Sequence, residues 1–425
     1  MGVKPGYKQT EVGVIPEEWE VQEFGSLYAE PSRNGIYKTA EFQGRGTRIV
    51  NMGEMFGFDF ISDQEMSRVA LSNKELLVSA LQGGDLLFGR RSVVPAGAGK
   101  CSLVITPQEP LTFESSIIRV RLNQGEAYPP FFYHFFASSE GRSVMSSIVS
   151  GTNVKGIRAS ELRELEIPIP PISEQETIAG ALEDMDALIG VLDRLIAKKR
   201  DLKQAAMQQL LTGQTRLPGF SAEWEVNRLE YLIELIPSGI YGDEKRRDGT
   251  MPCRVATTAH INENDAWNEK EMSVRYFSPE QIRKYLPTEG DLIVVKSSGS
   301  AEKIQSGKIG FVDKETAGKF LFSNFLMLLR PTSITPRFLY FYLCSYNVKK
   351  LLPMLVEAST YPNIRLDEYM NLEIPTPKPD EQTAIATVLS DMDAEIAALE
   401  ARRDKTRALK QGMMQELLTG RTRLV

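Results

Sequence analysis

Two stretches of the chain repeat apolar side chains at alternating spacings of four and three residues. The first pattern consists of Ile178, Leu182, Met185, Ile189 and Leu192, and the second of Ile385, Leu389, Met392, Ile396 and Leu399. Apolar positions that recur every 3.5 residues on average are typical of helices that pack together as a coiled coil. We therefore predict two long helices, each with one apolar seam along its length.

Local signals indicate where each helix starts and stops. Prolines come first, and then Ser173 or Asp380 stands as a candidate N-cap before Glu-Gln. The apolar pattern loosens near Lys198 and Lys405, and we expect it to resume at Leu202, Ala206 and Leu210 and at Leu409, Met413 and Leu417. Both helices should end at Thr-Gly, where glycine supplies a left-handed C-terminal cap. A helix from Glu174 to Leu211 would be about 55 Å long.

The chain is an internal duplication. Residues 166–217 align with residues 373–424 without a gap, and more than half of the positions are identical. Weaker matches precede each tail: Trp-Glu-Val at 19 and 224, Gly-Ile-Tyr at 35 and 239, Gly-Asp-Leu at 84 and 290, and Ile-Arg at 157 and 364. We therefore divide the chain into a first globular domain (1–165), a helix segment (166–217), a second globular domain (218–372) and a second helix segment (373–425).

A helix with a long apolar seam must bury it. The nearest partner is the duplicate helix of the same chain, and an antiparallel pair would put the globular domains at opposite ends, related by an approximate two-fold axis. Self-association between chains is the alternative for any coiled coil.

The globular parts have the patterns of mixed α and β structure. Short apolar or β-branched stretches predict strands at Thr47–Asn51, Asp85–Gly89, Ser116–Leu122, Asp291–Lys296 and Phe322–Arg330. One aromatic helix, started by proline, is expected before each tail. The fold class is therefore α+β: two mixed α/β domains joined by two long helices that pair as an antiparallel coiled coil.

Composition narrows the function. The 425 residues are 42% hydrophobic and 25% charged, with a net charge of −6. No stretch has the length and apolarity of a membrane span, and three isolated cysteines make neither a disulfide framework nor a metal motif, so we expect a reduced, cytoplasmic protein without a metal site. Of two histidines, His134 lies in an aromatic run and is interpreted as a core residue, whereas His260 has no identifiable partner in the sequence.

Several short strings resemble catalytic motifs and fail on inspection. Tyr128-Pro129-Pro130-Phe131 is similar to the loop of amino-group DNA methyltransferases, but a tyrosine ring cannot replace the Asn, Asp or Ser side chain that the loop requires. Gly97-Ala98-Gly99-Lys100 lacks the first glycine and the Ser/Thr of a phosphate loop. Gly-Ile-Tyr occurs without the Tyr-Ile-Gly of the nucleases that share it, and Pro379-Asp380-Glu381 is replaced by Ile172-Ser173-Glu174 in the other copy. We expect no catalytic residues and no enzymatic activity in this chain alone.

Two diverged domains that alternate with two near-identical helical tails resemble the specificity subunit of type I restriction–modification systems. The resemblance covers essentially the whole chain. It is carried by Thr10–Pro16 before Trp-Glu-Val, by the Glu-Ile-Pro-x-Pro and Glu-Gln-x-x-Ile motifs before both helices, and by the Leu-Leu-Thr-Gly endings.

This resemblance implies a DNA-binding subunit with two target recognition domains. Each would read one half of an asymmetric bipartite site in double-stranded DNA, with the paired helices as a spacer. Two modification (methyltransferase) subunits and restriction (motor-nuclease) subunits are the implied partners. Adenine-N6 methylation and ATP-dependent cleavage, with S-adenosylmethionine, ATP and Mg²⁺, would belong to those partners, and no cofactor is expected in this chain.

Basic and aromatic side chains near the repeated motifs are the candidate DNA contacts, because Lys and Arg bind phosphates and Arg can also bind guanine bidentately. In the first domain the candidates are Arg33, Tyr37, Lys38, Arg45, Arg48, Arg90, Arg91, Lys155 and Arg158. In the second domain they are Tyr241, Lys245, Arg246, Arg247, Arg254, Lys296, Lys308 and Arg365. The small residues of Ser297–Ser300 are a further candidate phosphate-binding loop. Each of these side chains has the alternative of being an ordinary solvated surface group.

Two other functions compete with this hypothesis. The acidic net charge favours a coiled-coil scaffold that binds proteins and does not recognise DNA. A self-sufficient methyltransferase would need to bind S-adenosylmethionine, for which the sequence has no glycine-rich loop.

Overall fold

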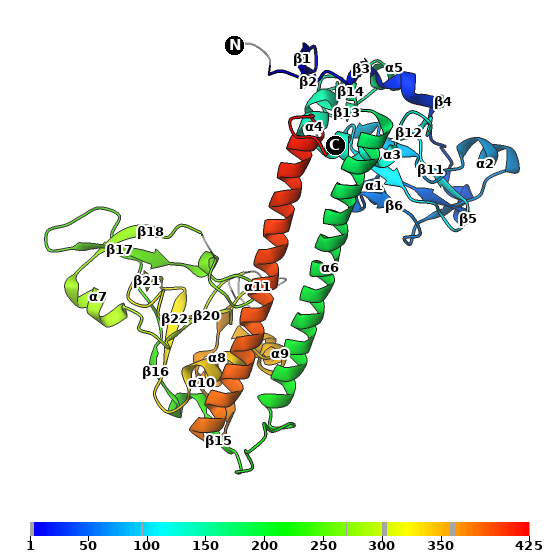
Figure 1. The fold of residues 1–425 in the computed structure, drawn as a ribbon. Coiled ribbons are helices and arrows are strands. Elements are labelled where there is room, and N and C mark those ends of the chain that lie inside the picture. The colour runs from blue at the N-terminus through cyan, green and yellow to red at the C-terminus, as the bar shows by residue number, and fades with distance from the viewer. Residues whose placement is uncertain (1–3, 95–96, 269, 300–303, 358–361, 425) are drawn as a thin grey trace. The chain divides into compact units, whose positions relative to one another are not determined.

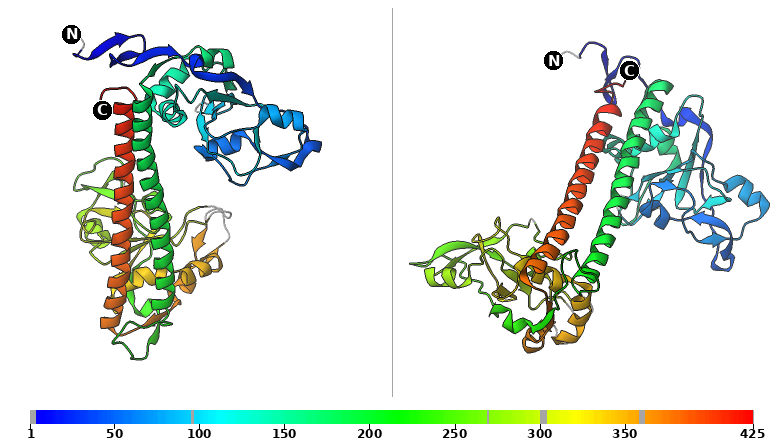
Figure 2. Two further views of the ribbon diagram at one scale, coloured as in Figure 1. Left: turned by 45° about the vertical axis from the view of Figure 1, so that its right-hand side comes forward. Right: turned by 60° about the horizontal axis from the view of Figure 1, so that its bottom comes forward.

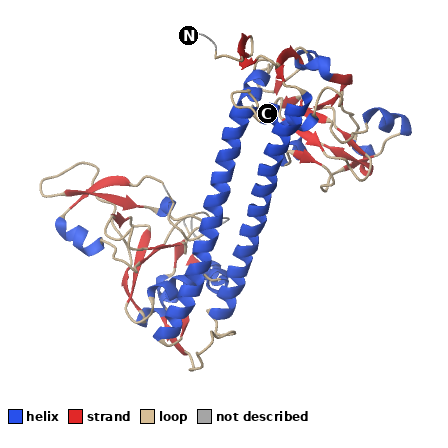
Figure 3. Cartoon of the chain, viewed as in Figure 1, coloured by secondary structure: helices blue, strands red, loops and turns tan. Residues whose placement is uncertain are grey.

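The computed structural model describes residues 4–94, 97–268, 270–299, 304–357 and 362–424. Ser300 of the candidate phosphate-binding loop therefore lies outside the described residues. The chain forms two compact units, Met1–Asp193 with Ala401–Val425, and Arg194–Glu400. Each unit holds one globular domain together with parts of both long helices, and each combines helices with strands (Figure 3). This is the expected α+β class.

The first unit contains the following strands and helices: β1 (Tyr7–Thr10), β2 (Gly13–Pro16), β3 (Glu20–Glu23), β4 (Tyr28–Asn34), β5 (Gln43–Val50), α1 (Met52–Gly57), β6 (Phe60–Ile61), β7 (Arg68–Val69), α2 (Asn73–Ser79), β8 (Leu86–Gly89), β9 (Arg91–Ser92), β10 (Cys101–Val104), β11 (Leu111–Phe113), β12 (Ile117–Leu122), α3 (Pro129–Ala137), α4 (Ser139–Ser146), β13 (Lys155–Gly156), α5 (Ala159–Arg163) and β14 (Glu166–Ile169).

The second unit contains a parallel set: β15 (Glu225–Arg228), β16 (Ile233–Ile236), β17 (Met251–Ala256), β18 (Ser273–Phe277), α7 (Pro279–Tyr285), β19 (Leu292–Val295), β20 (Ile309–Phe311), β21 (Phe320–Phe322), β22 (Leu326–Pro331), α8 (Pro336–Cys344), α9 (Tyr346–Leu355), β23 (Val356–Glu357), β24 (Asn363–Ile364), α10 (Leu366–Met370) and β25 (Glu373–Thr376). The long helices are α6 (Ile172–Leu210) and α11 (Pro379–Leu417).

The two domains share most of their sheet topology. In the first, one sheet has the strand order β4-β12-β8-β10-β6 and another β11-β5-β7. In the second, the corresponding orders are β16-β22-β19-β20 and β18-β17-β21. The Trp-Glu-Val strand pairs antiparallel with the Glu-Ile-Pro strand in both, as β3 with β14 and as β15 with β25. The motifs that repeat in the sequence are therefore structural partners within each unit.

The aromatic helix before each tail is in fact two helices, which corrects the expectation of one. The break falls at Ser138 between α3 and α4 and at Ser345 between α8 and α9, and both serines have extended backbone angles. The Ser138 hydroxyl accepts a hydrogen bond from the Gly141 N–H at 3.0 Å, an N-cap that starts α4. A Cβ atom on Gly141 would lie 1.9 Å from the Phe135 carbonyl oxygen, so the tight turn requires glycine.

Two further expectations need correction. The stretch Phe322–Arg330 is divided between β21 and β22, because a turn closed by the Leu326 N–H on the Ser323 carbonyl interrupts it. The long helices begin at Ile172 and Pro379, so Ser173 and Asp380 lie in the first helical turn and are not N-caps. The expected left-handed glycines are present, with φ of 72° at Gly213 and 69° at Gly420.

The long helices pair antiparallel inside each unit (Figures 1 and 2). In the first unit, Lys410 of α11 pairs with Asp186 of α6 at 2.5 Å. In the second unit, Lys203 of α6 pairs with Asp393 of α11 at 2.5 Å. These ion pairs join identical positions of the two repeats with the roles of the helices exchanged.

The apolar seam residues are buried or half-buried along these contacts. The buried members are Ile178, Leu182, Leu192, Ile385, Leu389 and Ile396, and the half-buried members are Met185, Ile189, Met392 and Leu399. The expected resumption of the seam at Leu202 and Leu409 is wrong, because these side chains are 48% and 57% exposed. Beyond them, Leu210 and Leu417 are buried in the domain cores.

Each core joins a globular domain to the helix ends. In the first unit, the aromatic side chains of α3 pack with the sheet residues Leu86 and Phe88 and with Ile178 and Leu417 of the long helices. In the second unit, Phe338 and Phe341 of α8 pack in a core that includes Leu210 and Ile385. Within the described part of the chain, no helix is long and apolar enough to cross a membrane.

Candidate nucleic-acid interface

A basic groove lies on the first domain where β9 pairs with β13. Its volume is about 520 Å³, and its lining includes Arg90, Arg91, Lys155 and Arg158. The Ile157 N–H donates to the Arg90 carbonyl at 3.0 Å, and this bond fixes two parts of the chain that are 67 residues apart side by side. None of the described residues that line the groove is acidic. Such a concentration of cations is a natural site for phosphate groups.

The side chains of this groove are only partly neutralised. The Arg91 side chain is exposed, and Arg158 is 75% exposed while it pairs with Glu161 at 3.2 Å. Arg90 donates to the Ser115 carbonyl at 3.2 Å, and the Lys155 ammonium donates to the Gly151 carbonyl at 2.8 Å. Bonds to neutral carbonyls orient these cations and leave their charge available to an anion.

The second domain has the same junction. There the Ile364 N–H donates to the Lys296 carbonyl at 2.9 Å, which matches the bond between Ile157 and Arg90. Lys296 and Arg365 thus occupy the places of Arg90 and Arg158. Arg365 pairs with Glu368 and donates to the Met354 carbonyl at 2.9 Å, and Lys296 donates to the Pro237 carbonyl at 3.3 Å. The Ile-Arg repeat of the sequence therefore marks a structural junction that both domains build.

Other candidates of the first domain lie around the strands before this groove. Arg33 on β4 and Arg45 on β5 are exposed, and Tyr37 is 80% exposed. Lys38 is held by Glu75 at 2.7 Å and lies over the Phe42 ring. Arg48 is only 4% exposed and pairs with Asp63 and Glu109, each at 2.8 Å. The expectation for Arg48 is therefore wrong, since its guanidinium stabilises the domain interior.

In the second domain, the remaining candidates include a basic segment before β17. Lys245, Arg246 and Arg247 are exposed, and Arg247 pairs with Asp243 at 3.1 Å. Arg254 on β17 is exposed as well. Lys308 is half-buried and donates to Gln305 at 3.3 Å.

Tyr241 is held in place by an arginine that the sequence did not single out. The Arg275 guanidinium lies 4.6 Å from the Tyr241 ring centroid and donates to its hydroxyl at 3.2 Å. The Gly-Ile-Tyr motif has the same backbone setting in both domains, because the Ile36 N–H donates to the Phe113 carbonyl and the Ile240 N–H to the Phe322 carbonyl. A Cβ on Gly239 would lie 2.0 Å from that Phe322 oxygen, which explains the glycine.

A charged cluster at the start of each long helix was missed by the sequence reasoning. In the first unit, the Glu174 carboxylate is 1% exposed and accepts from the Trp19 indole and from Arg423, at 2.9 Å each. In the second unit, Glu381 is likewise buried and accepts from the Trp224 indole at 3.0 Å and from Arg216 at 2.6 Å. These carboxylates raise the pKa of both arginines. The signal was present in the sequence, because all three residue types recur at matched positions in both copies.

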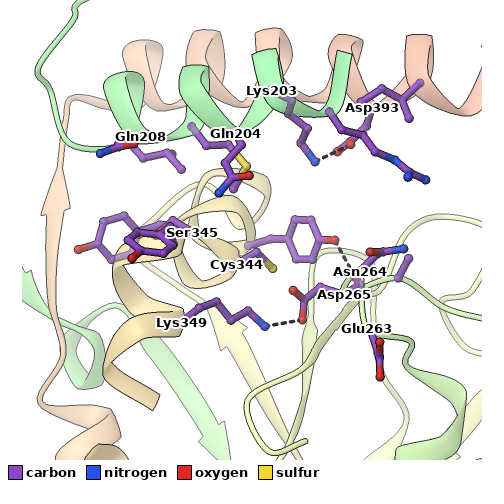
Figure 4. A pocket seen from close by; sticks show the side chains of 18 of the residues that line it. Lys203, Gln204, Gln208, Glu263, Asn264, Asp265, Cys344, Ser345, Lys349 and Asp393 are labelled. Carbon is purple, nitrogen blue, oxygen red and sulfur yellow. Dashed lines mark hydrogen bonds and ion pairs between the residues drawn. The ribbon is translucent and has the colours of Figure 1, made fainter. Parts of the chain in front are cut away.

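A cavity in the second unit is unsuited to phosphate. It has a volume of about 740 Å³ and lies where α8 and α9 face α6 and α11 (Figure 4). Its described cations are all paired: Lys203 with Asp393, Lys349 with Asp265, and Arg200 with Glu400. Burial raises the pKa of the Cys344 thiol beside them, so the thiol stays protonated. This cavity therefore offers no excess positive charge.

The histidines are structural. His134 is fully buried, as the aromatic run predicts, and neither ring nitrogen has a hydrogen-bond partner among the described residues. His260 does have partners, which corrects the expectation: its Nδ1 accepts from the Thr257 N–H at 3.0 Å. Among the described residues, no group of His, Cys, Asp or Glu side chains is arranged to hold a metal ion.

Comparison with known proteins identifies the family of this chain. The family model described as the type I restriction modification DNA specificity domain matches the chain twice, over residues 16–198 and 222–406. The chain belongs to the type I restriction–modification specificity family. It is thus a specificity subunit with two target recognition domains, a non-catalytic component that acts in a complex with DNA and other subunits.

Individual relatives support the match, in one case across both domains. The chain is 23% identical to the type I restriction enzyme MjaVIII specificity subunit of Methanocaldococcus jannaschii over 96% of this chain and 94% of that protein. It is 26% identical to the type I restriction enzyme EcoKI specificity subunit of Escherichia coli over 47% of this chain and 43% of that protein. The crystal structure of the type I restriction–modification S subunit from M. genitalium has the same fold, with a TM-score of 0.57, 16% identity and 98% of each chain covered.

Proposed function

We propose that each target recognition domain of this specificity subunit reads one half of an asymmetric bipartite DNA site through its basic junction. The observation that carries the proposal is the equivalence of the Arg90–Arg158 and Lys296–Arg365 junctions, each closed by the same backbone hydrogen bond. The equivalent junctions would orient both domains on DNA in the same way. The different side chains around them would let each domain read a different half-site. A dimer of identical chains would instead require identical half-sites.

The candidate contacts divide into two roles. The exposed cations Arg33, Arg45, Arg91, Arg158, Arg254 and the segment 245–247 are proposed to bind phosphates and so to position the domain. Tyr37 and Tyr241 follow equivalent glycines and are proposed to contact bases or sugars. Lys38, Lys155, Lys296, Lys308, Arg90 and Arg365 would act from the walls of these surfaces, where they are already held by intramolecular bonds.

The partner subunits are proposed to supply the chemistry. Two modification subunits would dock beside the paired helices, and restriction subunits would join that complex. Adenine-N6 methylation with S-adenosylmethionine, and DNA cleavage driven by ATP with Mg²⁺, would take place in those subunits. The paired helices would act as a spacer that fixes the distance between the half-sites.

Selection from a random duplex pool tests the proposal. The chain, assembled with its modification subunit, is incubated with random double-stranded DNA, and bound duplexes are separated by gel shift and sequenced. We expect enrichment of two short words separated by a gap of fixed length. Specific binding to protein partners without any enriched DNA sequence would instead support a scaffold function and contradict the proposal.

A further inference from the structure

Exposed valines lie directly beside the basic groove of the first domain. Val93 is 77% exposed and Val94 is 50% exposed, and both follow Arg91 at the end of β9. Val154, which is 49% exposed, lines the groove itself next to Lys155. Removal of branched aliphatic side chains from water lowers the free energy. Three of them at one basic rim therefore indicate a surface that becomes covered.

Hydrogen bonds hold the backbone of Val94, the second residue after β9. The Val94 N–H donates to the Ser92 hydroxyl at 3.0 Å, and the Gly97 N–H donates to the Val94 carbonyl at 2.9 Å. Gly97 lies against Phe56, because a Cβ atom there would come within 2.4 Å of the phenylalanine ring. Phe56, beside Gly97, is itself 43% exposed.

The combination of cations and aliphatic groups limits what can cover this rim. A protein partner would meet four basic side chains in a groove whose described lining has no carboxylate. Duplex DNA presents phosphates to the cations and, in the major groove, a single kind of apolar group on the base edges, which is the C5 methyl of thymine. Thymine therefore complements both halves of the surface.

We infer that the first target recognition domain reads at least one thymine in its half-site by contact of the C5 methyl group with Val93 and Val94. The inference rests on the proposed function, because it presumes that this groove faces DNA. By the alignment of Lys296 with Arg90, Val93 corresponds in the second domain to Gly299, which has no side chain to contact a methyl group.

Deoxyuridine substitution tests the inference, because it removes only the C5 methyl group. The chain with its modification subunit is bound to its own recognition duplex, and each thymine in turn is replaced by deoxyuridine. The half-site of the first domain is identified as the one whose base preferences change in the Tyr37→Ala variant, because Tyr37 is proposed to contact bases or sugars. We expect at least one substitution in that half-site to weaken binding about fourfold, the factor for one buried methyl group.

The double variant Val93→Ala/Val94→Ala should bind the thymine and deoxyuridine duplexes equally. The matched control is Leu77→Ala on α2, which removes an 84% exposed apolar side chain away from the groove and should keep the preference for thymine. Specific binding that is indifferent to every deoxyuridine in that half-site, or a half-site without thymine, would overturn the inference and leave the proposed function intact. Undiminished discrimination by the double variant, or a loss of assembly with the modification subunit, would also overturn it. A failure to bind any duplex specifically would instead contradict the proposed function.

Discussion

Glu381 is a buried carboxylate whose three hydrogen bonds all come from Trp224 and Arg216. Glu381→Gln keeps the shape but removes the charge that strengthens these bonds, so we expect the free energy of unfolding to fall by about 2 kcal/mol. Urea unfolding followed by tryptophan fluorescence measures this change. The control is Glu225→Gln, where a 68% exposed carboxylate pairs with Lys378 and the loss should stay within about 0.5 kcal/mol. Equal losses in both variants would contradict a structural role for Glu381.

His134 makes the stability of the first unit dependent on pH. Burial, and then the charge of nearby Lys410, lower the pKa of its imidazole to about 3, against an ordinary value of 6.5. Below pH 6.5 the unfolded chain takes up a proton that the folded chain refuses, so stability falls as the pH decreases from 6.5 toward 3. In that range this group lowers the free energy of unfolding by up to about 1.4 kcal/mol for each pH unit.

The second domain suggests the variant that removes this effect, since Phe341 stands at the place of His134 in the aligned helix. We expect the melting temperature of His134→Phe to fall less than that of the wild type when the pH is lowered from 7 to 5. Circular dichroism measures both melting temperatures. The comparison uses the pH dependence and not the absolute stability, so a small packing penalty does not affect it. Parallel pH profiles for the two proteins would contradict the assignment.

The short β9–β13 pair carries the positive charge that we propose binds DNA. Arg91→Ala should weaken binding similarly at all sequences and reduce the salt slope, d log K/d log[salt], by about 1, because one phosphate contact is lost. The measurement is fluorescence anisotropy across a range of salt concentrations. Lys405→Ala removes the same charge from an exposed position on α11 and should leave the slope unchanged. A slope that responds equally to both substitutions would show that only net charge matters.

At the scale of elements, periodic apolar patterns in the sequence predicted the long helices, whereas the local breaks between helices could not be predicted. The seam from Ile178 to Leu192 and its copy identify the long helices because a helix repeats its exposed and buried faces regularly. The divisions at Ser138 and Ser345 depend on a hydroxyl cap and a close glycine contact, which leave no periodic trace. The exposure of Leu202 and Leu409 could not be predicted either, because apolar spacing alone does not reveal which members of a seam become buried.

Single basic residues were the least predictable features. Arg48 looked like its neighbour Arg45 in the sequence, and only the fold shows that Asp63 and Glu109 meet its guanidinium in the interior. By contrast, Arg158 and Arg365 stood at repeated positions, and that recurrence corresponds to a shared junction in the structure. Repetition within the chain carried information that composition could not.

For the whole molecule, the similarity of the two tails has a physical reason inside the chain. Lys410 pairs with Asp186 just as Lys203 pairs with Asp393, and Arg423 binds Glu174 just as Arg216 binds Glu381. A change in one tail therefore removes the partner of a residue in the other. These reciprocal contacts, in addition to any shared partner surface, favour similar sequences in both tails.

Lengthening both helices tests the proposed spacer. One heptad is inserted into α6 and one into α11 beside the Arg200–Glu400 pair, which keeps the apolar register. The added length is about 10.5 Å, so we expect the gap between the half-sites to grow by about three base pairs while both words stay the same. Methylated-site sequencing measures the gap. Altered half-site bases with an unchanged gap would contradict the spacer role.

The central claim is that one chain carries two different DNA readers. It is tested most directly by long-read methylome sequencing of a methylation-free host that expresses this chain with its modification subunit. We predict one asymmetric motif made of two unlike words with a fixed gap, which loses the base preference of one word in Tyr37→Ala and of the other word in Tyr241→Ala. A single undivided or palindromic motif, or methylation without any motif, would contradict the account.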